Sequence, residues 1–218
     1  MLYRVAEVME GRHAQFAEEV ARAEGLTAAK ARAVVDAAID RWVWYAGWTD
    51  KIAQVAGSAN PVQGPYFNFS VPEPTGVVAV LAPQGSSLLG LVSVVAPVVA
   101  GGNTAVVVTS ADRPLPAVTL AEALATSDVP GGVVNLLTGK AAEIGPWLAD
   151  HLDVNAIDLT GVAGDRELAA DLEVRAAENM KRVLRAPASE PDWTAVPNGP
   201  QRILAWCETK TVWHPTGI

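Results

Sequence analysis

The chain from Pro74 onward repeats one unit: a short run of β-branched residues, a turn and a helical stretch. The strand-like runs lie at 77–81, 104–108, 133–137 and 156–159. Helical stretches follow them, beginning near Leu88 and at Pro114, and then covering 142–150 and 166–181. Strands that alternate with helices indicate βαβ units with parallel pairing and right-handed crossovers. The order therefore predicts an α/β fold built on an open, doubly wound, Rossmann-like parallel sheet.

Before this pattern begins, residues 1–56 favour helices. Apolar residues recur at helical spacing over 2–21, which predicts one amphipathic helix that ends at Gly25. Thr27 can cap the N-terminus of a second helix. Tryptophans cluster towards the end of this second helix and are expected in the core: Trp42, Trp44 and Trp48. We expect these N-terminal helices to pack against the sheet.

The remaining segments differ in composition from both regions. Residues 57–65 hold Gly and Pro breakers, which predict a loop, and 66–70 alternate like an exposed antiparallel strand. The stretch 186–200 carries four prolines and no apolar period, as a linker does, and the apolar tail beyond it must dock on something. The predicted division is 1–56 N-terminal helices, 57–75 loop and strand, 76–186 βαβ domain, 187–200 linker and 201–218 C-terminal tail.

Charge and cysteine content exclude several classes of protein. Lys and Arg number 16 against 24 Asp and Glu, a net charge of −8, so we expect no nucleic-acid partner and no anionic membrane partner. The single cysteine, Cys207, excludes an intramolecular disulfide, and no His/Cys pairs have zinc-ligand spacing. The start of the chain lacks a signal-peptide layout, and the most apolar run, 88–100, is too short to span a bilayer. These features predict a cytoplasmic location and no metal site.

Ligands of an open parallel sheet bind at the carboxyl ends of its strands. Those ends carry the turns at 82–85, 109–112, 138–140 and 160–165. Glycines and hydroxyls in these turns could offer amides to a phosphate, but the spacing is not that of a dinucleotide-binding motif, and such glycines more often serve the turn itself. The histidines lie away from the strand ends, at His13, His151 and His214. We therefore assign no catalytic residue.

A series of motifs also occurs in a defined order. They are Ala46–Ile52, Pro72–Val78, Ala100–Val107, Val129–Gly139, Glu143–Gly145, Asp158–Gly161 and Ala176–Val183. In order and spacing this series resembles the aldehyde dehydrogenase superfamily over nearly all of 2–183. The resemblance implies a cofactor-binding-like domain and, from 66–70 and 209–213, a small antiparallel oligomerisation sheet. It also implies contacts to an NAD(P) cofactor from Pro83, Ser110, Gly139, Thr160, Gly161 and Val162.

The sequence departs from the family pattern where the family holds its cofactor and the oxyanion. The family's Pro-Trp-Asn is Pro83-Gln84-Gly85 here, so the Asn that helps to hold the oxyanion, a donor worth ~3 kcal/mol, is absent. The family's Lys-Pro-Ser-Glu is Val108-Thr109-Ser110-Ala111, so both charged cofactor contacts are absent. Arg166 stands where the close-approach glycine is expected, and Asp165 adds an anion beside the expected phosphates. We expect no tightly bound cofactor and NAD(P) binding that is weak at best.

The largest departure is an absence inside the family pattern. After Val183 the family continues through Glu-Leu-Gly-Gly-Lys, which supplies the general base, and into a domain that carries the nucleophilic cysteine. Here Leu184 leads into the linker, and the chain resembles the family again at 208–213, the terminal strand of the oligomerisation sheet. Cys207 lies in that strand segment, away from any predicted base or helix N-terminus, so we expect a structural thiol.

Three functions are compatible with such a chain. The first is a catalytically silent aldehyde dehydrogenase-like subunit that acts in oligomeric assembly, with itself or with a full-length aldehyde dehydrogenase, using 201–218 as the assembly element. In the family this sheet joins the neighbouring subunit by strand addition. The alternative is NAD(P)-dependent aldehyde oxidoreductase activity completed by another chain. The third is a bare nucleotide-binding module, against which Val108 and Ala111 argue.

Overall fold

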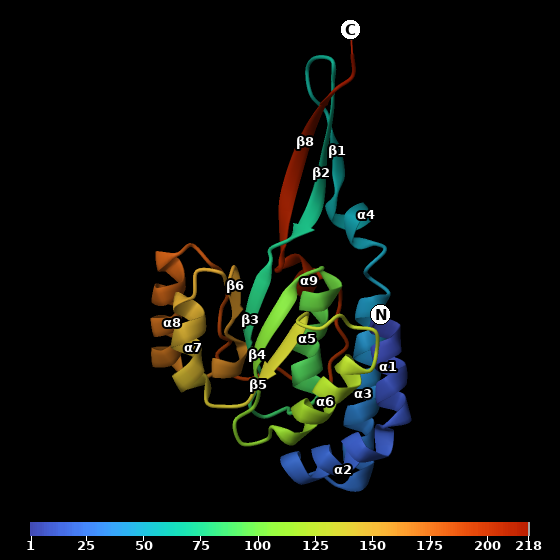
Figure 1. Ribbon diagram of the computed structural model, residues 1–218, viewed down its shortest axis with the longest axis vertical. Coiled ribbons are helices and arrows are strands. Elements are labelled where there is room, and N and C mark those ends of the chain that lie inside the picture. The colour runs from blue at the N-terminus through green and yellow to red at the C-terminus, as the bar shows by residue number, and fades with distance from the viewer. Residues whose placement is uncertain (218) are drawn as a thin grey trace.

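The computed structural model describes residues 1–217; Ile218, the last residue of the predicted tail, lies outside the described residues. A main α/β body carries a narrow three-stranded sheet that projects from one end (Figure 1). We call this projecting sheet, whose strands are β1 (Ser58–Asn60), β2 (Tyr66–Pro74) and β8 (Cys207–Pro215), the arm. The N-terminus lies on the main body, and β8 runs out to the tip of the arm.

The main body is built on five parallel strands in the order β5-β4-β3-β6-β7. Their bounds are β3 (Val77–Leu81), β4 (Thr104–Val108), β5 (Val134–Leu137), β6 (Ala156–Asp158) and β7 (Arg182–Leu184). The chain adds strands on one side of β3 and then crosses to the other side, which is the arrangement of a doubly wound sheet. The predicted α/β fold is confirmed.

Helices cover both faces of this sheet (Figure 1). On one face lie α5 (Leu89–Ala100) and α6 (Leu115–Ala125), and on the other lie α7 (Ala141–Asp150) and α8 (Arg166–Glu178). The central strand shows the division directly, because Val78 and Val80 belong to the core beneath α5, whereas Ala79 and Leu81 belong to the core beneath α7 and α8. Alternate side chains of a strand point to opposite faces, so a strand covered on both faces is apolar throughout.

The boundaries of the helices of the main body differ from the sequence prediction by one to three residues. Helix α6 begins at Leu115, and Pro114 is the residue that precedes its first turn. Helix α8 ends at Glu178 rather than at Lys181, because Met180 adopts a left-handed backbone conformation with φ of +57°. Outside the helix, the Lys181 ammonium donates a hydrogen bond to the backbone carbonyl of Val154 at 2.7 Å.

Three helices make up most of the N-terminal region: α1 (Leu2–Gly11), α2 (His13–Glu24) and α3 (Ala28–Ala46). The prediction of one continuous helix over 2–21 is wrong, because the backbone leaves the helical conformation at Arg12 (φ −112°, ψ 16°). The break turns α2 so that the apolar faces of both α1 and α2 reach the same core as α3. As predicted, Gly25 (φ +66°) ends α2, and the Thr27 hydroxyl caps α3 by accepting a hydrogen bond from the backbone amide of Lys30.

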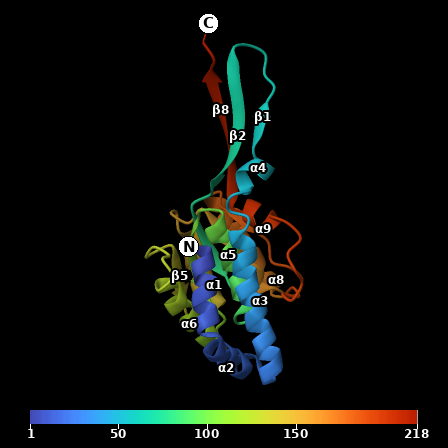
Figure 2. The same cartoon turned by 90° about the vertical axis from the view of Figure 1, so that its right-hand side faces the viewer.

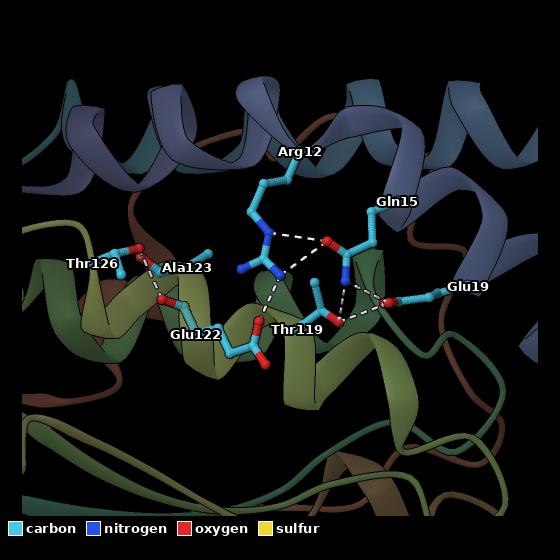
Figure 3. A network of polar contacts seen from close by, with 7 residues as sticks. All are labelled: Arg12, Gln15, Glu19, Thr119, Glu122, Ala123 and Thr126. Carbon is cyan, nitrogen blue, oxygen red and sulfur yellow. Dashed lines mark hydrogen bonds and ion pairs between the residues drawn. The ribbon is translucent and has the colours of Figure 1, made fainter.

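A polar network holds the α1–α2 break against α6 (Figure 3). The Arg12 guanidinium donates to the Glu122 carboxylate at 2.6 Å and to the Gln15 amide oxygen at 2.9 Å. Gln15 and Thr119 in turn donate to one carboxylate oxygen of Glu19, at 3.0 and 2.8 Å. Because Glu19 is buried, these bonds offset part of the cost of removing its charge from water. The network therefore links the break between α1 and α2 to α6.

The tryptophans of α3 divide between the core and its edge. Trp42 is fully buried, as predicted. Trp44 and Trp48 are partly buried and pack against the same core. The short helix α4 (Ile52–Ala56) then leads from this region into the arm.

The arm is an antiparallel sheet in the order β1-β2-β8, and it stands away from the body in both views (Figures 1 and 2). The predicted strand at 66–70 is part of β2, which extends to Pro74 because it pairs with β8 along its whole length. Strand β1 lies in the segment predicted as a loop, and that prediction is wrong for residues 58–60, which pair with 68–70. A strand this short leaves no alternating pattern in the sequence to detect.

The C-terminal tail docks on the main body before it enters the arm. Helix α9 (Gln201–Leu204) packs against α5, and Ile203 and Trp206 are fully buried in the core beneath α3 and α5. The prediction that the tail docks is therefore confirmed. Because the chain's own helices cover Ile203 and Trp206, the expectation that the tail serves assembly stays a prediction that concerns β8. Trp213, on β8, is 57% exposed.

Candidate functional site

The six residues implied by the family resemblance lie along one edge of the main sheet. Parallel pairing brings the carboxyl ends of β5, β4, β3 and β6 to the same edge, in that order. Pro83 follows β3, Ser110 follows β4, Gly139 follows β5, and 160–162 follow β6. The sequence thus predicts the position of the candidate site, and the contacts of each residue decide what the site can bind.

The turns after β3 and β4 are joined by Gln84, which stands where the family has Trp. The Ser110 hydroxyl donates to the backbone carbonyl of Gln84 at 2.9 Å, and the Gln84 side-chain oxygen accepts from the backbone amide of Ala111 at 3.0 Å. The Arg113 guanidinium donates to the backbone carbonyl of Gly85. The hydroxyl proton of the predicted site residue Ser110 is therefore used in a hydrogen bond within the chain and is not free to bind a ligand.

A carboxylate from the predicted linker occupies the turn after β3. Glu190 accepts hydrogen bonds from the backbone amides of Gly85 and Ser86, at 2.8 and 2.9 Å, and from the indole N–H of Trp193 at 3.1 Å. The indole fits against α5 because position 90 is glycine; a Cβ on Gly90 would lie 3.0 Å from the indole nitrogen. Sequence reasoning missed Glu190, and no local signal marks it, since its partners are distant in the chain.

The next amide of the same turn is also bound to a carboxylate. The backbone amide and the hydroxyl of Ser87 both donate to Glu24, at 2.7 and 2.8 Å. Negative charge at the N-terminus of a helix is stabilised by the helix dipole, and here the helix is α5. Two carboxylates of the chain thus bind all three amides of 85–87, which are the groups that an external anion would need.

The turn after β6 is organised around a buried carboxylate. Asp158 is fully buried and accepts hydrogen bonds from the backbone amide of Thr160, at 2.8 Å, and from its hydroxyl. Arg202 of α9 donates to the other carboxylate oxygen of Asp158 at 3.3 Å. Burial raises the pKa of Asp158, while the Arg202 charge and the Thr160 hydrogen bonds act in the opposite direction. The amide and hydroxyl of Thr160 are therefore committed to Asp158.

The glycines of the candidate site serve contacts within the chain. A Cβ on Gly161 would lie 2.2 Å from the backbone carbonyl oxygen of Ala82, so the glycine permits close packing of this turn on the end of β3. Its neighbour Val162 is buried in the core beneath α7 and α8. Gly139 has a φ of +152°, and a Cβ there would lie 2.6 Å from the Ile144 side chain. The packing within the chain therefore accounts for the residue type at each of these three positions without a cofactor.

The departures from the family pattern also have structural roles. Asp165 caps α8 by accepting a hydrogen bond from the backbone amide of Leu168 at 3.0 Å, and Arg166 is the exposed first residue of that helix. Val108, where the family has Lys, is fully buried. Asp165 and Val108 therefore contribute to folding at positions where the family contacts its cofactor.

The family implies an NAD(P) cofactor at this edge of the sheet, and the residues present do not fit it. A dinucleotide needs free backbone amides for its pyrophosphate. The amides of 85–87 are bound to carboxylates, and the polar groups of Thr160 and Ser110 are bound within the chain. Binding would require rupture of the hydrogen bonds between Thr160 and Asp158, and Glu190 covers the neighbouring turn beside Pro83.

The single cysteine shows no sign of activation. The Cys207 thiol donates to the backbone carbonyl of Ile203, with the sulfur 3.4 Å from the oxygen. Burial raises the pKa of this thiol, and the nearby Arg182 charge opposes the shift only in part. A high pKa keeps the thiol protonated, whereas a catalytic cysteine needs the thiolate.

Two further features are absent from the part of the chain that the structure describes. Within 1–217, no group of three His, Cys, Asp or Glu side chains is placed to hold a metal ion. Over the same residues, no helix combines the length and the apolar character that crossing a membrane requires.

Comparisons with known proteins agree with this fold. The family model described as "Aldehyde dehydrogenase family" matches residues 1–186. The chain is 39% identical over 165 residues to hydroxyisobutyraldehyde dehydrogenase of Mycolicibacterium austroafricanum. This match covers 74% of this chain and 31% of that protein. It is also 35% identical over 170 residues to cytosolic 10-formyltetrahydrofolate dehydrogenase of Pongo abelii. This second match covers 74% of this chain and 18% of that protein.

Solved structures show the same partial correspondence. The NAD⁺ complex of aldehyde dehydrogenase from Bacillus cereus aligns with a TM-score of 0.77 and 27% identity, over 84% of this chain and 36% of that one. The chain thus spans about a third or less of the length of the relatives described here. Since the family model covers most of its residues, this chain belongs to the aldehyde dehydrogenase family.

Proposed function

We propose that this chain is a catalytically silent aldehyde dehydrogenase-like subunit that acts in oligomeric assembly, either with itself or with a full-length aldehyde dehydrogenase. The observation that carries the proposal is the arm, in which the outer edge of β8 has no strand neighbour among residues 1–217. A free strand edge can accept a further strand through main-chain hydrogen bonds. A projecting sheet with such an edge is suited to pairing with another subunit.

Aromatic side chains on the arm support the same proposal. Tyr66 and Trp213 pack edge to face with ring centroids 5.9 Å apart, and Phe67 and Phe69 pack with centroids 5.4 Å apart. Because neighbouring residues of a strand point to opposite faces, the two pairs lie on the two faces of the arm. Tyr66, Phe67 and Trp213 are all exposed. Exposed aromatic groups of this kind are frequent anchors at protein interfaces.

The proposal of a silent subunit is supported by the contacts at the sheet edge and at Cys207. Glu190 binds the amides of the turn that follows Pro83, Thr160 is bound to Asp158, and burial raises the pKa of the Cys207 thiol. We therefore expect the isolated chain to produce no NAD(P)H from simple aldehydes. Production that survives Cys207→Ser would show that another group of residues does the chemistry, and loss of production in that variant would identify the cysteine as a nucleophile.

Size-exclusion chromatography with light scattering tests the assembly proposal. The chain is measured alone over a range of concentrations and after mixing with a full-length aldehyde dehydrogenase from the same organism. We expect a mass above that of the 22.8 kDa monomer, or co-elution with the dehydrogenase. A monomeric mass at high concentration together with no co-elution would contradict the proposal, and aldehyde oxidation gained only in the mixture would favour activity completed by another chain.

A pair of variants identifies the surface responsible. Phe67→Ser combined with Trp213→Ser removes an exposed aromatic from each face of the arm, and we expect it to reduce the measured mass towards the monomer. Trp147→Ser is the matched control, because Trp147 is 77% exposed but lies on α7, on the main body. Equal effects of the two changes would exclude the arm as the specific contact.

The proposal includes a cytoplasmic location. The sequence holds a single cysteine and therefore no intramolecular disulfide, which supports a reducing compartment.

A further inference from the structure

A cavity of about 350 Å³ lies between helices α3, α5 and α9 and the segment 191–199. This segment is outside the 1–186 region that matches the family, so its cavity is a feature of this chain's own linker. Helix α3 contributes Arg41 and Tyr45, and α9 contributes Arg202. The size is at the lower end of the range for small-molecule sites. The cavity is separate from the carboxylate-filled turn at 85–87 described above.

Arg41 is a buried cation with no carboxylate partner among residues 1–217. Its guanidinium donates to the Ser93 hydroxyl at 2.6 Å and to the backbone carbonyls of Trp193 and Ala195 at 2.8 and 3.1 Å. All three acceptors are neutral, and they use three of the five donors that arginine carries. Burial lowers the pKa of Arg41, and the neighbouring Arg202 charge adds to this effect. A buried charge of this kind is costly unless an opposite charge reaches it.

A second cation and a hydroxyl converge on the same cavity. The Arg202 guanidinium lies over the Trp193 ring, 5.2 Å from its centroid, and pairs with Asp158 on its other side. Tyr45 is 1% exposed and lines the same cavity. Burial raises the pKa of Tyr45, although both guanidiniums act in the opposite direction. The phenol therefore stays protonated, as a donor near two cations.

The acidic group on the cavity wall does not neutralise Arg41. Asp192 is exposed, and its carboxylate accepts hydrogen bonds from the backbone amide and hydroxyl of Thr194, at 2.9 and 2.6 Å. The rest of the wall combines the Trp193 ring with the apolar side chains of Pro191, Val196 and Pro197. The cavity thus has cationic donors at one end and apolar surface beside them, which is the pattern that recognises an anion with an organic body.

We propose that this cavity binds a small organic carboxylate, whose charged group is held by Arg41, Arg202 and the Tyr45 hydroxyl. The planar guanidinium groups match the two oxygens of a carboxylate, and the apolar wall covers the rest of the ligand. This binding does not depend on assembly through the arm. Arg41 also ties the 191–199 segment to α3, so ligand binding would hold that segment more firmly in place.

The test uses the full chain and benzoate as the probe, with benzamide as its uncharged analogue and inorganic phosphate as an anion without an organic body. The indole N–H resonance of Trp193 is followed by two-dimensional NMR during each titration. We expect benzoate to shift this resonance saturably, with benzamide and phosphate binding more weakly. No shift with benzoate, or an equal affinity for benzamide, would overturn the proposal. Tighter binding of phosphate would show an anion site that is not built for an organic carboxylate, which also overturns it.

Variants separate recognition from folding. Arg41→Gln should weaken benzoate binding about tenfold or more through loss of a charge-assisted interaction, but it also loosens the linker. Val196→Glu avoids that difficulty, since Val196 is 78% exposed at the cavity rim and the change adds only a repelling charge. We expect Val196→Glu to weaken benzoate binding about threefold or more, and Val196→Gln to leave it unchanged. Equal affinities of these two variants would contradict recognition by charge.

Discussion

The carboxylate of Glu190 lies 2.8 Å from the backbone nitrogen of Gly85 and accepts its hydrogen bond, although 105 positions separate the two residues. This contact lays the linker across the carboxyl end of β3. The family resemblance implies a cofactor at this edge of the sheet, and the chain's own negative charge is there instead. An anionic ligand would have to displace Glu190 before it could reach the amides of the turn.

The first prediction is that NAD and NADP bind weakly and that Glu190→Ala improves their binding. Removal of the carboxylate frees two amide donors and eliminates its repulsion of phosphate, so we expect affinity to rise about tenfold. Calorimetry measures both constants. Asp192→Ala is the matched control, because this exposed carboxylate belongs to the same segment but bonds only to Thr194. A micromolar or tighter constant for the unaltered chain would contradict the prediction.

The second prediction concerns Gly161, which the family resemblance assigns to the cofactor. Gly161→Ala would place a Cβ 2.2 Å from the Ala82 carbonyl oxygen, so we expect the free energy of unfolding to fall by about 1–3 kcal/mol or more without any cofactor present. Gly131→Ala is the control, since a Cβ there meets nothing within 4 Å. Chemical denaturation of both variants checks the difference, and similar stabilities would mean that the turn relaxes without cost.

The third prediction separates the two tryptophans of the C-terminal tail. Trp206 is fully buried beside α5, so Trp206→Ala should lower the free energy of unfolding by about 3–5 kcal/mol. Trp213 makes an edge-to-face contact with Tyr66 on the exposed arm, so Trp213→Ala should cost about 1 kcal/mol or less in the monomer. Denaturation at low protein concentration measures both. The reverse order of costs would show that the tail is held by the arm rather than by the core.

The fourth prediction is a pH dependence of Cys207 reactivity. Because burial raises the pKa of the thiol, alkylation by iodoacetamide near neutral pH should be slower in the folded chain than in denaturant, and its rate should rise as pH increases towards the raised pKa. Arg182→Gln removes the charge that opposes this shift and should slow alkylation further. Arg185→Gln serves as the control, because Arg185 pairs with Glu173 instead. Folded-state alkylation as fast as in denaturant would contradict a protected thiol.

Several elements were predictable because their signals are local. Apolar periodicity and turn residues are properties of neighbouring positions, and they predict four of the five strands of the main sheet, all except β7, as well as the left-handed end of α2 at Gly25 and the cap at Thr27. The break at Arg12 was not predictable in this way, since the apolar pattern continues through it. At the break, the structure places Arg12 against α6, where Glu122 accepts a hydrogen bond from its guanidinium.

In the candidate site, too, the positions of the residues were predictable from the sequence, whereas their contacts were not. The order of strands and helices places Pro83, Ser110, Gly139 and 160–162 at one edge of the sheet, because parallel strands bring their carboxyl ends together. The hydrogen bonds of these residues could not be predicted. They depend on Gln84, Asp158 and Glu190, whose contacts are set by how turns and linker pack.

The sequence by itself determined the α/β fold, the family resemblance and the edge of the sheet at which a site would lie, because these follow from patterns between near neighbours in the chain. Only the tertiary structure decided that the linker covers the turn after β3 and that Arg41 holds the Trp193 carbonyl, 152 positions away. Such contacts depend on which distant segments lie side by side. Their energy comes from burying charges and hydrogen-bonding groups together, which no local pattern records.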